Sequence, residues 1–411
     1  MIISDPVHGF IEIPDGILCD LIKHPYVVRL QRIGQLGPTS FVYPGGRHTR
    51  FAHSIGTLHL ISEALRVLKH KGYTITPEEE LGAQIAMLLH DAGHGPMSHC
   101  LEGLFLPDLC HEDVSLIIMQ RLNEQFNGQL NTAIQIFTDQ YPKHFLHELI
   151  CSQLDMDRLD YLCRDSFFTG VREGNIGAER IIKMLNVEND HLVVDAKGIY
   201  TIENYLMSRR LMYWQVYLHK TALAAQEVLL TALLRAKELA ARGTRLHTSS
   251  SLEYFLYNQV DTTFREVHPE WIERFIMLDD SDIISALKEW TCGQDKVLSI
   301  LAGNYINRNL FKANEINSPL PDDQLENLRR QVATQLSIPL TDAHYFVRPR
   351  RVSQMLYSTA DDHIIIGMKD NTVRDISNFS ELLHSEMVDR RSERYYVFTQ
   401  RGLQTQPPVC K

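Results

Sequence analysis

The sequence lacks several features, and each absence excludes a class of protein. Its seven cysteines are odd in number, scattered and without a CxxC pair, so we expect reduced thiols rather than a disulfide framework. It has no run of the ~18–20 apolar residues that a membrane-spanning helix needs. The first residues show no basic segment followed by an apolar one, so we expect no secretory signal. Together these absences predict a cytoplasmic protein that makes no membrane contact.

An excess of positive charge is also missing. The chain has 41 Lys and Arg residues against 51 Asp and Glu residues, a formal net charge of −10. Extended nucleic-acid binding depends on a basic surface that neutralises phosphates, so we do not expect it here. A small basic pocket for one phosphorylated molecule remains compatible with this charge. The 411 residues, 44% hydrophobic and 22% charged, are typical of a globular protein of two or three domains.

Apolar residues recur at helical spacing through most of the chain, which predicts a mainly α fold. Strong start signals stand at Thr76, Pro77 and Glu79, which are an N-cap, an N1 proline and a capping-box partner. The predicted helices cover 17–36 (divided by Pro25), 50–71, 77–91, 111–127, 131–138, 144–165, 176–187 and 203–242, with more helices over 251–337. A β-hairpin is predicted over 188–202, strands over 343–348, 363–368 and 395–399, and a helix over 377–389.

These patterns predict three domains. Residues 1–245 would form a helical catalytic core, 246–340 a helical extension, and 341–411 a small α+β segment. The arginine-rich runs 348–351 and 389–394 are interpreted as solvated or subunit-contact surface, with binding of an anionic effector as the alternative.

The most distinctive local feature is His90-Asp91, followed by the sequence AGHGPMSH. An imidazole nitrogen and a carboxylate oxygen are both good ligands for a first-row divalent metal. The residues Ala92, Gly93 and Gly95 have a small side chain or none, which would let an ion and a phosphate approach the backbone. For a lone pair of this kind the alternative is that His90 caps its helix and Asp91 bonds to backbone.

Residues elsewhere in the chain favour the metal interpretation. His53 falls early in a predicted helix, and Asp157 and Asp160 share one face of another helix at i, i+3. His53, His90, Asp91 and one aspartate near 157 would form a site of two nitrogens and two oxygens with open positions. Such a site suits Mn²⁺, Fe²⁺, Ni²⁺, Zn²⁺ or Mg²⁺, and the ligand count does not choose among them. Asp155 and Asp160 are interpreted as solvated or capping residues.

The order H…HD…D, with its HDxGHGPxSH extension, resembles the HD-domain metal-dependent phosphohydrolases, in particular the deoxynucleoside triphosphate (dNTP) triphosphohydrolase branch. The resemblance is dense over residues 5–240. The matching blocks are DPVHGFIEI, LQRIGQLG, FVYPGGRHTRFAHSIG, QIAMLLHDAGHGPMSH, HED, DMDRLDYLCRD and SRR…YLHK. The resemblance implies an HD fold, a divalent metal cofactor, a nucleotide substrate hydrolysed to deoxynucleoside and tripolyphosphate, and a homo-oligomer (dimer or tetramer).

The resemblance also implies roles for individual residues. The implied metal ligands are His53, His90, Asp91 and Asp157. The implied catalytic residues around the phosphates are His94, His99 and His111, with Glu102 where the family usually has Asp. The implied sugar contacts are Gln35, Leu36, Tyr161, Asp165 and Tyr217, with Asp165 also near the phosphate edge. The implied phosphate contacts are Arg50, Arg158 (where a Lys usually stands) and Arg209.

Each of these residues also has a structural interpretation. His94, His99 and His111 could be helix-end residues, Arg50 and Arg158 could be salt-bridge partners, and the tyrosines could be packing residues.

One departure from the family concerns regulation. Members activated by a guanine nucleotide carry Asp, Gln and Arg where this chain has Lys23, Val28 and Gln31, so the resemblance does not support that effector site. Two other functions stay open: a phosphatase or phosphodiesterase acting on another nucleotide, and a catalytically silent nucleotide sensor.

Overall fold

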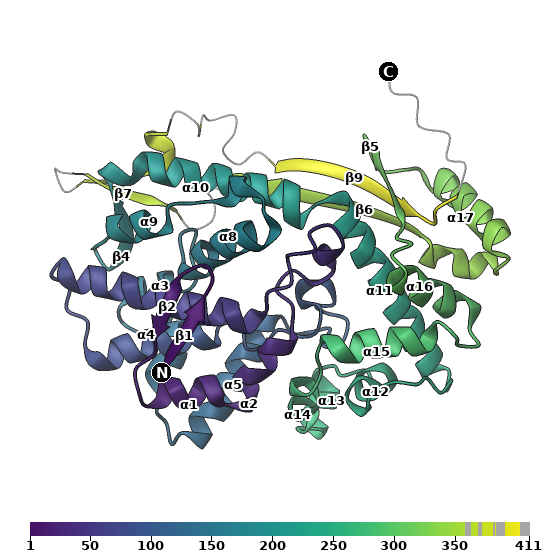
Figure 1. The fold of residues 1–411 in the computed structure, drawn as a ribbon, viewed down its shortest axis with the longest axis horizontal. Coiled ribbons are helices and arrows are strands. Elements are labelled where there is room, and N and C mark those ends of the chain that lie inside the picture. The colour runs from purple at the N-terminus through teal and green to yellow at the C-terminus, as the bar shows by residue number, and fades with distance from the viewer. Residues whose placement is uncertain (358–362, 369–371, 381–382, 384–390, 403–411) are drawn as a thin grey trace.

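The computed structural model describes residues 1–357, 363–368, 372–380, 383 and 391–402. The fold is mainly α, as predicted, with small sheets. Figure 1 shows the N-terminal helices on the left, the helices of the extension on the right, and two long strands that run along one edge above them. Among the described residues, no helix combines the length and apolar character needed to cross a bilayer.

The first helices follow the local signals of the sequence. After a hairpin of β1 (Ile2–Asp5) and β2 (Gly9–Glu12), α1 (Ile17–Lys23) ends before the proline that begins α2 (Pro25–Val28). The long helix α3 spans Arg50–His70. The next helix, α4 (Pro77–Leu89), begins with the predicted capping box, in which the side chains of Thr76 and Glu79 each accept from the other's backbone N–H.

The prediction of one continuous helix over 144–165 is wrong, because the chain leaves the helical conformation in the middle of this range. It is two helices, α7 (His144–Glu148) and α8 (Met156–Thr169). The break occurs because Asp155 caps α8, its side chain accepting a hydrogen bond from the backbone N–H of Arg158. The neighbouring helices, α5 (His111–Gln125) and α6 (Asn131–Phe137), agree with the prediction.

The predicted hairpin lies a few residues earlier than expected. Helix α9 (Ala178–Met184) leads directly into β3 (Leu185–Glu188), which pairs antiparallel with β4 (His191–Asp195). The turn residues Asn189 and Asp190 have positive φ angles of 52° and 66°, a conformation that Asn and Asp tolerate in hairpin turns. The glycine at 198 precedes a helix instead of forming the turn.

The predicted long helix over 203–242 is also divided. Helix α10 (Ile199–Met212) continues into a π turn (Tyr213–Tyr217), and α11 (Lys220–Ala241) begins anew after His219, whose ring accepts from the backbone N–H of Thr221. The break places Tyr217 beside Asp165 of α8, to which its hydroxyl donates a hydrogen bond of 2.7 Å.

Helices dominate the following segment, as predicted, but one strand interrupts them. The helices are α12 (Ser250–Tyr257), α13 (Thr262–Val267), α14 (Trp271–Ile276), α15 (Asp280–Trp290), α16 (Lys296–Ile306) and α17 (Asp322–Leu336). The strand is β5 (Lys312–Ile316), which pairs with a C-terminal strand.

The C-terminal strands join two different sheets. They are β6 (Val347–Met355), β7 (Ile365–Gly367), β8 (Val373–Asp375) and β9 (Arg391–Thr399). One sheet has the order β5-β9-β6, and the other, β3-β4-β7-β8, adds C-terminal strands to the earlier hairpin.

The strand expected over 343–348 begins only at Val347, because Leu340–Tyr345 form a 3-10 turn. Of the helix expected over 377–389, residues 381–382 and 384–389 lie outside the described residues, and a 3-10 turn covers Ile376–Asn378. The three-domain division stays a prediction.

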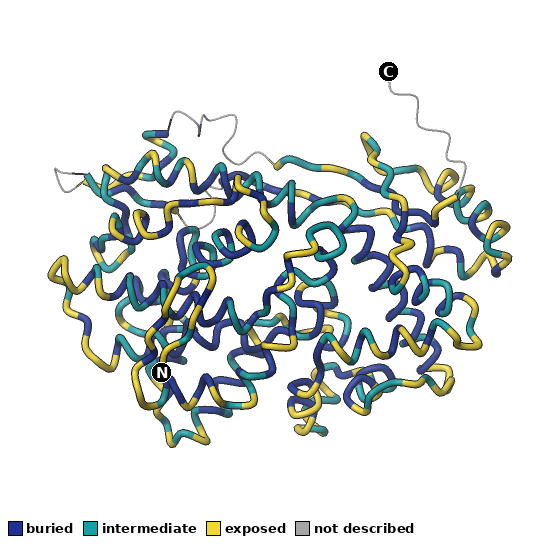
Figure 2. Tube along the Cα trace, in the orientation of Figure 1, coloured by how far each residue is buried: buried dark blue, intermediate teal, exposed yellow. Residues whose placement is uncertain are grey.

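A contiguous apolar core extends through the described chain, from Ile11 in the first hairpin to Phe398 in β9. Figure 2 shows the buried segments concentrated where helices face one another. Helix α3 packs against both α4 and α8. This packing brings the HD motif at the end of α4 close to His53 of α3 and the aspartates of α8.

Candidate active site

Four of the predicted ligands converge where α3, α4 and α8 meet. The Nε2 atom of His53 lies 2.9 Å from Oδ1 of Asp157 and 3.5 Å from Oδ2 of Asp91. The Nε2 atom of His90 lies 3.5 Å from the same Asp157 oxygen. Residues more than 100 positions apart in the chain therefore present two imidazole nitrogens and two carboxylates to one point.

The donor chemistry of this point fits a divalent metal ion. The Nδ1 atom of His90 donates to the carbonyl oxygen of Met87 at 2.7 Å, which leaves the lone pair on Nε2. The Nε2 atoms of His53 and His90 are buried and make no well-formed hydrogen bond. A buried imidazole nitrogen without a partner is costly, and a metal ion facing two carboxylates would satisfy both nitrogens.

The interpretation of Asp160 as a solvated or capping residue is wrong. Asp160 is fully buried, and its carboxylate contacts Nδ1 of His53 and Nε2 of His8, each at 2.7 Å. Arg164 donates to both of its oxygens. Burial alone would raise the pKa of Asp160, but the Arg164 guanidinium outweighs it and holds that pKa well below the usual range. Asp155, in contrast, does cap its helix.

The ligand aspartates stay ionised because cations and imidazoles surround them. Burial disfavours the charge on Asp91, but Arg50 and His90 keep its pKa well below the usual value. Arg50 donates from Nη1 to Asp91 at 2.6 Å and from Nε to Ser98 Oγ at 3.0 Å. For Asp157, burial is again outweighed, and its contacts with the two ligand histidines lower the pKa. Both carboxylates are thus ready to bind a cation near neutral pH.

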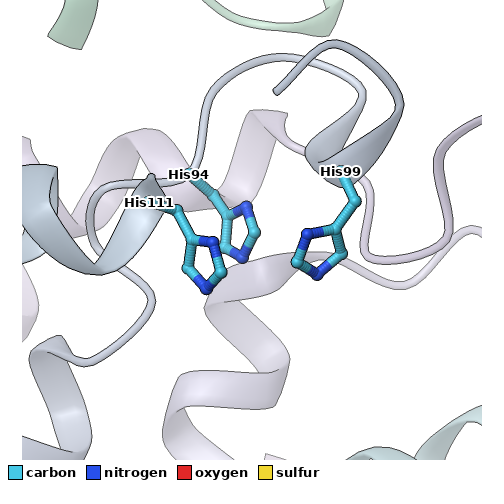
Figure 3. A group of neighbouring side chains, drawn as sticks. All are labelled: His94, His99 and His111. Atoms are coloured by element: carbon cyan, nitrogen blue, oxygen red, sulfur yellow. The ribbon is translucent and has the colours of Figure 1, made fainter. Parts of the chain in front are cut away.

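A second histidine group lies next to this point. Figure 3 shows His94, His99 and His111 brought together from the loop after α4, the following 3-10 turn and the start of α5. The rings of His94 and His111 stack with centroids 3.9 Å apart, and His99 meets both edge-on. Glu102 reaches two of them, with Oε1 2.7 Å from Nδ1 of His111 and Oε2 2.8 Å from Nδ1 of His99.

The pKa values of His94 and His111 are shifted in opposite directions. Burial, with Arg50 adding to it, holds the pKa of His94 well below its usual value, so this ring is neutral. Burial also opposes the charge on His111, but the hydrogen bond to Glu102 outweighs it and raises the pKa of His111. The same hydrogen bonds from His111 and His99 lower the pKa of Glu102. An imidazole with a lowered pKa and one with a raised pKa therefore stand side by side.

A cavity of about 450 Å³ is lined by Asp91 and Asp157 of the ligand cluster and by all three residues of the second histidine group. The predicted substrate residues that line it are Gln35, Leu36, Arg50, Arg158, Tyr161, Asp165 and Tyr217. Arg158 is held by Asp155 and by the carbonyl of Ser152. Asp165 accepts from Tyr217 and also contacts Nε2 of His48 at 2.7 Å. The cavity is thus lined by carboxylate and imidazole groups at the ligand cluster, and by Arg, Tyr and Gln side chains over the rest of its wall.

Arg209 is the one predicted phosphate contact that the structure does not bring to this cavity. Its guanidinium is buried and donates to Oε1 of Gln153 and to the carbonyl of Leu356, each at 2.8 Å. It does not line the cavity wall. The hydrogen bond to Leu356, the residue that follows β6, directs the Arg209 side chain away from the cavity.

Sequence reasoning missed one arginine of the cavity wall. Arg350 of β6, interpreted as surface, lines the cavity together with Gln226 of α11. Its Nη1 donates to Oε1 of Gln226 at 3.3 Å and to Oε1 of the buried Glu227 at 3.1 Å. Nothing in the local sequence distinguishes this arginine from its neighbours, because its position depends on where β6 packs.

The role expected for Gly93 is also wrong. A Cβ atom at this position would lie 2.1 Å from the carbonyl oxygen of His111 and 2.4 Å from the backbone nitrogen of Ser115. The glycine therefore lets the HD loop pack against α5, and it does not open a path for an ion or phosphate. The Ser115 hydroxyl accepts from the backbone N–H of Gly93 and donates to the carbonyl of His90, which fixes the loop.

Comparisons with known proteins agree with the fold described above. Residues 176–247 match the family described as the HD associated region. The uncharacterized protein YwfO of Bacillus subtilis is 34% identical over 324 residues, covering 77% of this chain and 72% of the relative. A solved phosphohydrolase from Bacteroides thetaiotaomicron is 51% identical with a TM-score of 0.95, covering 98% of this chain and all of that one.

Relatives with a named activity are more distant. A deoxynucleoside triphosphate triphosphohydrolase SAMHD1 homolog of Dictyostelium discoideum is 30% identical, covering 58% of this chain and 49% of the relative. The SAMHD1 protein of Danio rerio is 28% identical, covering 61% of this chain and 48% of the relative. The chain spans about half the length of these two triphosphohydrolases.

The fold and the site define an HD-family phosphohydrolase, which confirms the resemblance found in the sequence. Within that family, the chain belongs to the HD-domain proteins related to the dNTP triphosphohydrolases.

Proposed function

We propose that this protein is a metal-dependent dNTP triphosphohydrolase that releases deoxynucleoside and tripolyphosphate. The observation that carries the proposal is that the ligand cluster and the second histidine group adjoin one cavity of about 450 Å³. That volume lies within the range of small-molecule sites. The named activity of the relatives from Dictyostelium and Danio supports dNTPs as the substrate class.

Four residues would hold the metal: His53, His90, Asp91 and Asp157. A divalent ion bound there would polarise a phosphoryl oxygen and lower the pKa of a nearby water. Its identity among Mn²⁺, Fe²⁺, Ni²⁺, Zn²⁺ and Mg²⁺ stays open. Asp160 orients the His53 ring from behind, as outer contacts of metal ligands do.

The remaining side chains would serve the triphosphate and the sugar. Arg50 and Arg158 carry permanent charges whose planar donors match phosphate oxygens. Asp165 and Tyr217, joined by a hydrogen bond, would position the sugar together with Gln35. The triphosphate would thereby lie with its α-phosphorus toward the ligand cluster.

In the proposed reaction, the oxygen of a water forms a bond to the α-phosphorus, and the bond from that phosphorus to the 5′ oxygen breaks. The attacking water releases one proton to solvent as its oxygen becomes part of the tripolyphosphate, and the 5′ oxygen must gain a proton as it leaves. His111 is the donor best suited to this step, because the hydrogen bond to Glu102 raises the pKa of its ring. Attack at the α-phosphorus, rather than at another position, is inferred from the family resemblance.

Product analysis tests this function. The purified protein is analysed for bound metal and then incubated with Mn²⁺ and each of the four dNTPs, and the products are separated by chromatography. Tripolyphosphate and deoxynucleoside support the proposal. Orthophosphate, or a linear dinucleotide from a cyclic one, would instead identify a phosphatase or phosphodiesterase, and nucleotide binding without turnover would identify a sensor.

The matched control for this test is Asp91→Ala. We expect this variant to lose bound metal and turnover together while its helical circular-dichroism spectrum stays unchanged. Full activity in Asp91→Ala would remove the assignment of the site.

Assembly and location complete the proposal. We propose a homo-oligomer, a dimer or tetramer, in the cytoplasm. Sedimentation velocity with and without dNTP tests the assembly, and a single monomeric species under both conditions would contradict it.

A further inference from the structure

A second cluster of imidazole and carboxylate groups lies outside the active site. It consists of His144 and Glu148 of α7 and His191 at the start of β4, and one ligand atom from each lies within 4.8 Å of the others. It borders a different cavity, which shares no lining residue with the active-site cavity. The HD motif and the proposed reaction use none of these residues.

The distances in this cluster match those between ligands of one metal ion. Oε1 of Glu148 lies 3.0 Å from Nδ1 of His191 and 3.4 Å from Nε2 of His144. In a tetrahedral site with bonds of about 2.0–2.1 Å, neighbouring ligand atoms lie about 3.3 Å apart. The spacing of i, i+4 on α7 directs His144 and Glu148 to the same side of the helix, where the first residue of β4 meets them.

Outer contacts orient two of the three side chains. Nδ1 of His144 lies 2.6 Å from Oδ1 of Asp139, which turns the Nε2 atom of this ring toward Glu148. The second oxygen of Glu148 accepts from the backbone N–H of Leu192 at 2.5 Å, leaving the first oxygen for the cluster. A carboxylate behind a histidine is the arrangement that fixes the ring of metal-ligating histidines.

We propose that His144, Glu148 and His191 form a second divalent-metal site, separate from the HD site. Two imidazoles and one carboxylate are a ligand set that Zn²⁺ uses with a fourth position left for water or substrate. That position would face the neighbouring cavity of about 420 Å³. The ion would also join α7 to the β3–β4 hairpin. The proposal does not rest on the nucleotide substrate of the HD site.

Metal stoichiometry tests the site. Metal-free full-length protein is titrated with Zn²⁺ alone against a chromophoric chelator, and bound metal is counted by mass spectrometry. His191→Ala should bind one equivalent fewer than the wild type. The side chain of His191 is 58% exposed, so its removal leaves the core intact. The matched control is His268→Ala, which removes a partly exposed histidine that pairs, among the described residues, with a single carboxylate, Glu270, at 3.2 Å. This variant should retain the wild-type stoichiometry.

A second variant tests the orientation of His144. Asp139 has a positive φ of 56°, which Asn also tolerates, so Asp139→Asn preserves the backbone while weakening the outer contact. We expect its affinity for Zn²⁺ at this site to fall by about 10–100-fold. Equal Zn²⁺ stoichiometry in the wild type and His191→Ala would overturn the proposal. Phosphohydrolase activity should be equal in the wild type and in His191→Ala. The Zn²⁺ stoichiometry therefore tests this site, and the reaction products separately test the proposed dNTP hydrolysis.

Discussion

Nδ1 of His53 lies 2.7 Å from Oδ2 of Asp160, and both side chains are completely buried. This contact fixes the plane of the imidazole, so that its other nitrogen faces Asp91 and Asp157. Asp160 is in turn held by Arg164, which also donates to Asp5 at 2.8 Å. The geometry of the ligand cluster therefore depends on residues that do not belong to it.

The first prediction concerns this support. Asp160→Asn keeps the size of the side chain but removes the charge that orients His53 and balances Arg164. We expect metal affinity to fall by about 10–100-fold, as for other outer contacts of metal ligands. Metal titration measures the effect, and Asp323→Asn, which changes an exposed acid on α17, is the control. Unchanged affinity in Asp160→Asn would show that the ring does not need this partner.

The second prediction concerns pH. Glu102 raises the pKa of His111, so the ring should stay protonated to a higher pH than a free histidine, and activity should decline as the pH rises through that raised pKa. Glu102→Gln removes the negative charge and lowers the pKa of His111. The alkaline limb of the pH–rate profile should therefore shift to lower pH. Glu63→Gln, which changes a partly exposed acid that pairs with Arg66, should leave the limb in place. A limb unmoved in Glu102→Gln would remove His111 as the proton donor.

The third prediction concerns the packing of α3 against α8. A Cβ atom at Gly56 would lie 2.0 Å from Oδ1 of Asp160 and 2.2 Å from Nη2 of Arg164. Gly56→Ala should therefore lower the free energy of unfolding by about 1–3 kcal/mol, the usual cost of overpacking. Gly303→Ala is the control, because α16 leaves open space at that position, and the change should stabilise by about 0.4–1 kcal/mol. Urea unfolding compares the two variants, and equal effects would contradict the close approach of α3 and α8.

The fourth prediction concerns the cavity wall. Because Arg350 lines the active-site cavity, Arg350→Gln should raise KM for the nucleotide by about tenfold or more, since a charge-assisted hydrogen bond contributes about 1.5–3 kcal/mol. Arg351 is the matched control, because it is the next residue on β6 but pairs with Glu393 at the surface. Steady-state kinetics on Arg351→Gln should match the wild type. A KM unchanged in Arg350→Gln would place this arginine outside the substrate contacts.

Local sequence signals predicted those parts of the structure that local forces determine. The capping box of Thr76 and Glu79 begins α4 as expected, because capping involves groups only three residues apart. The HD motif and His53 predicted a metal site from their ligand types, and the family resemblance added Asp157 as the fourth ligand. The break between α7 and α8 was missed, although Asp155 is a good N-cap, because the apolar pattern continues through it.

Packing between distant segments decided the rest. Asp160 and Asp157 are alike by sequence and lie on one helix face, yet one is buried behind His53 and the other faces the cavity. Arg350 lines the candidate active-site cavity while Arg209 bonds to a C-terminal carbonyl, the reverse of what the sequence indicated. The partner of a side chain depends on which helices and strands pack against its own element. That packing is decided by the apolar surface buried over the whole chain, and a short sequence pattern does not contain this information.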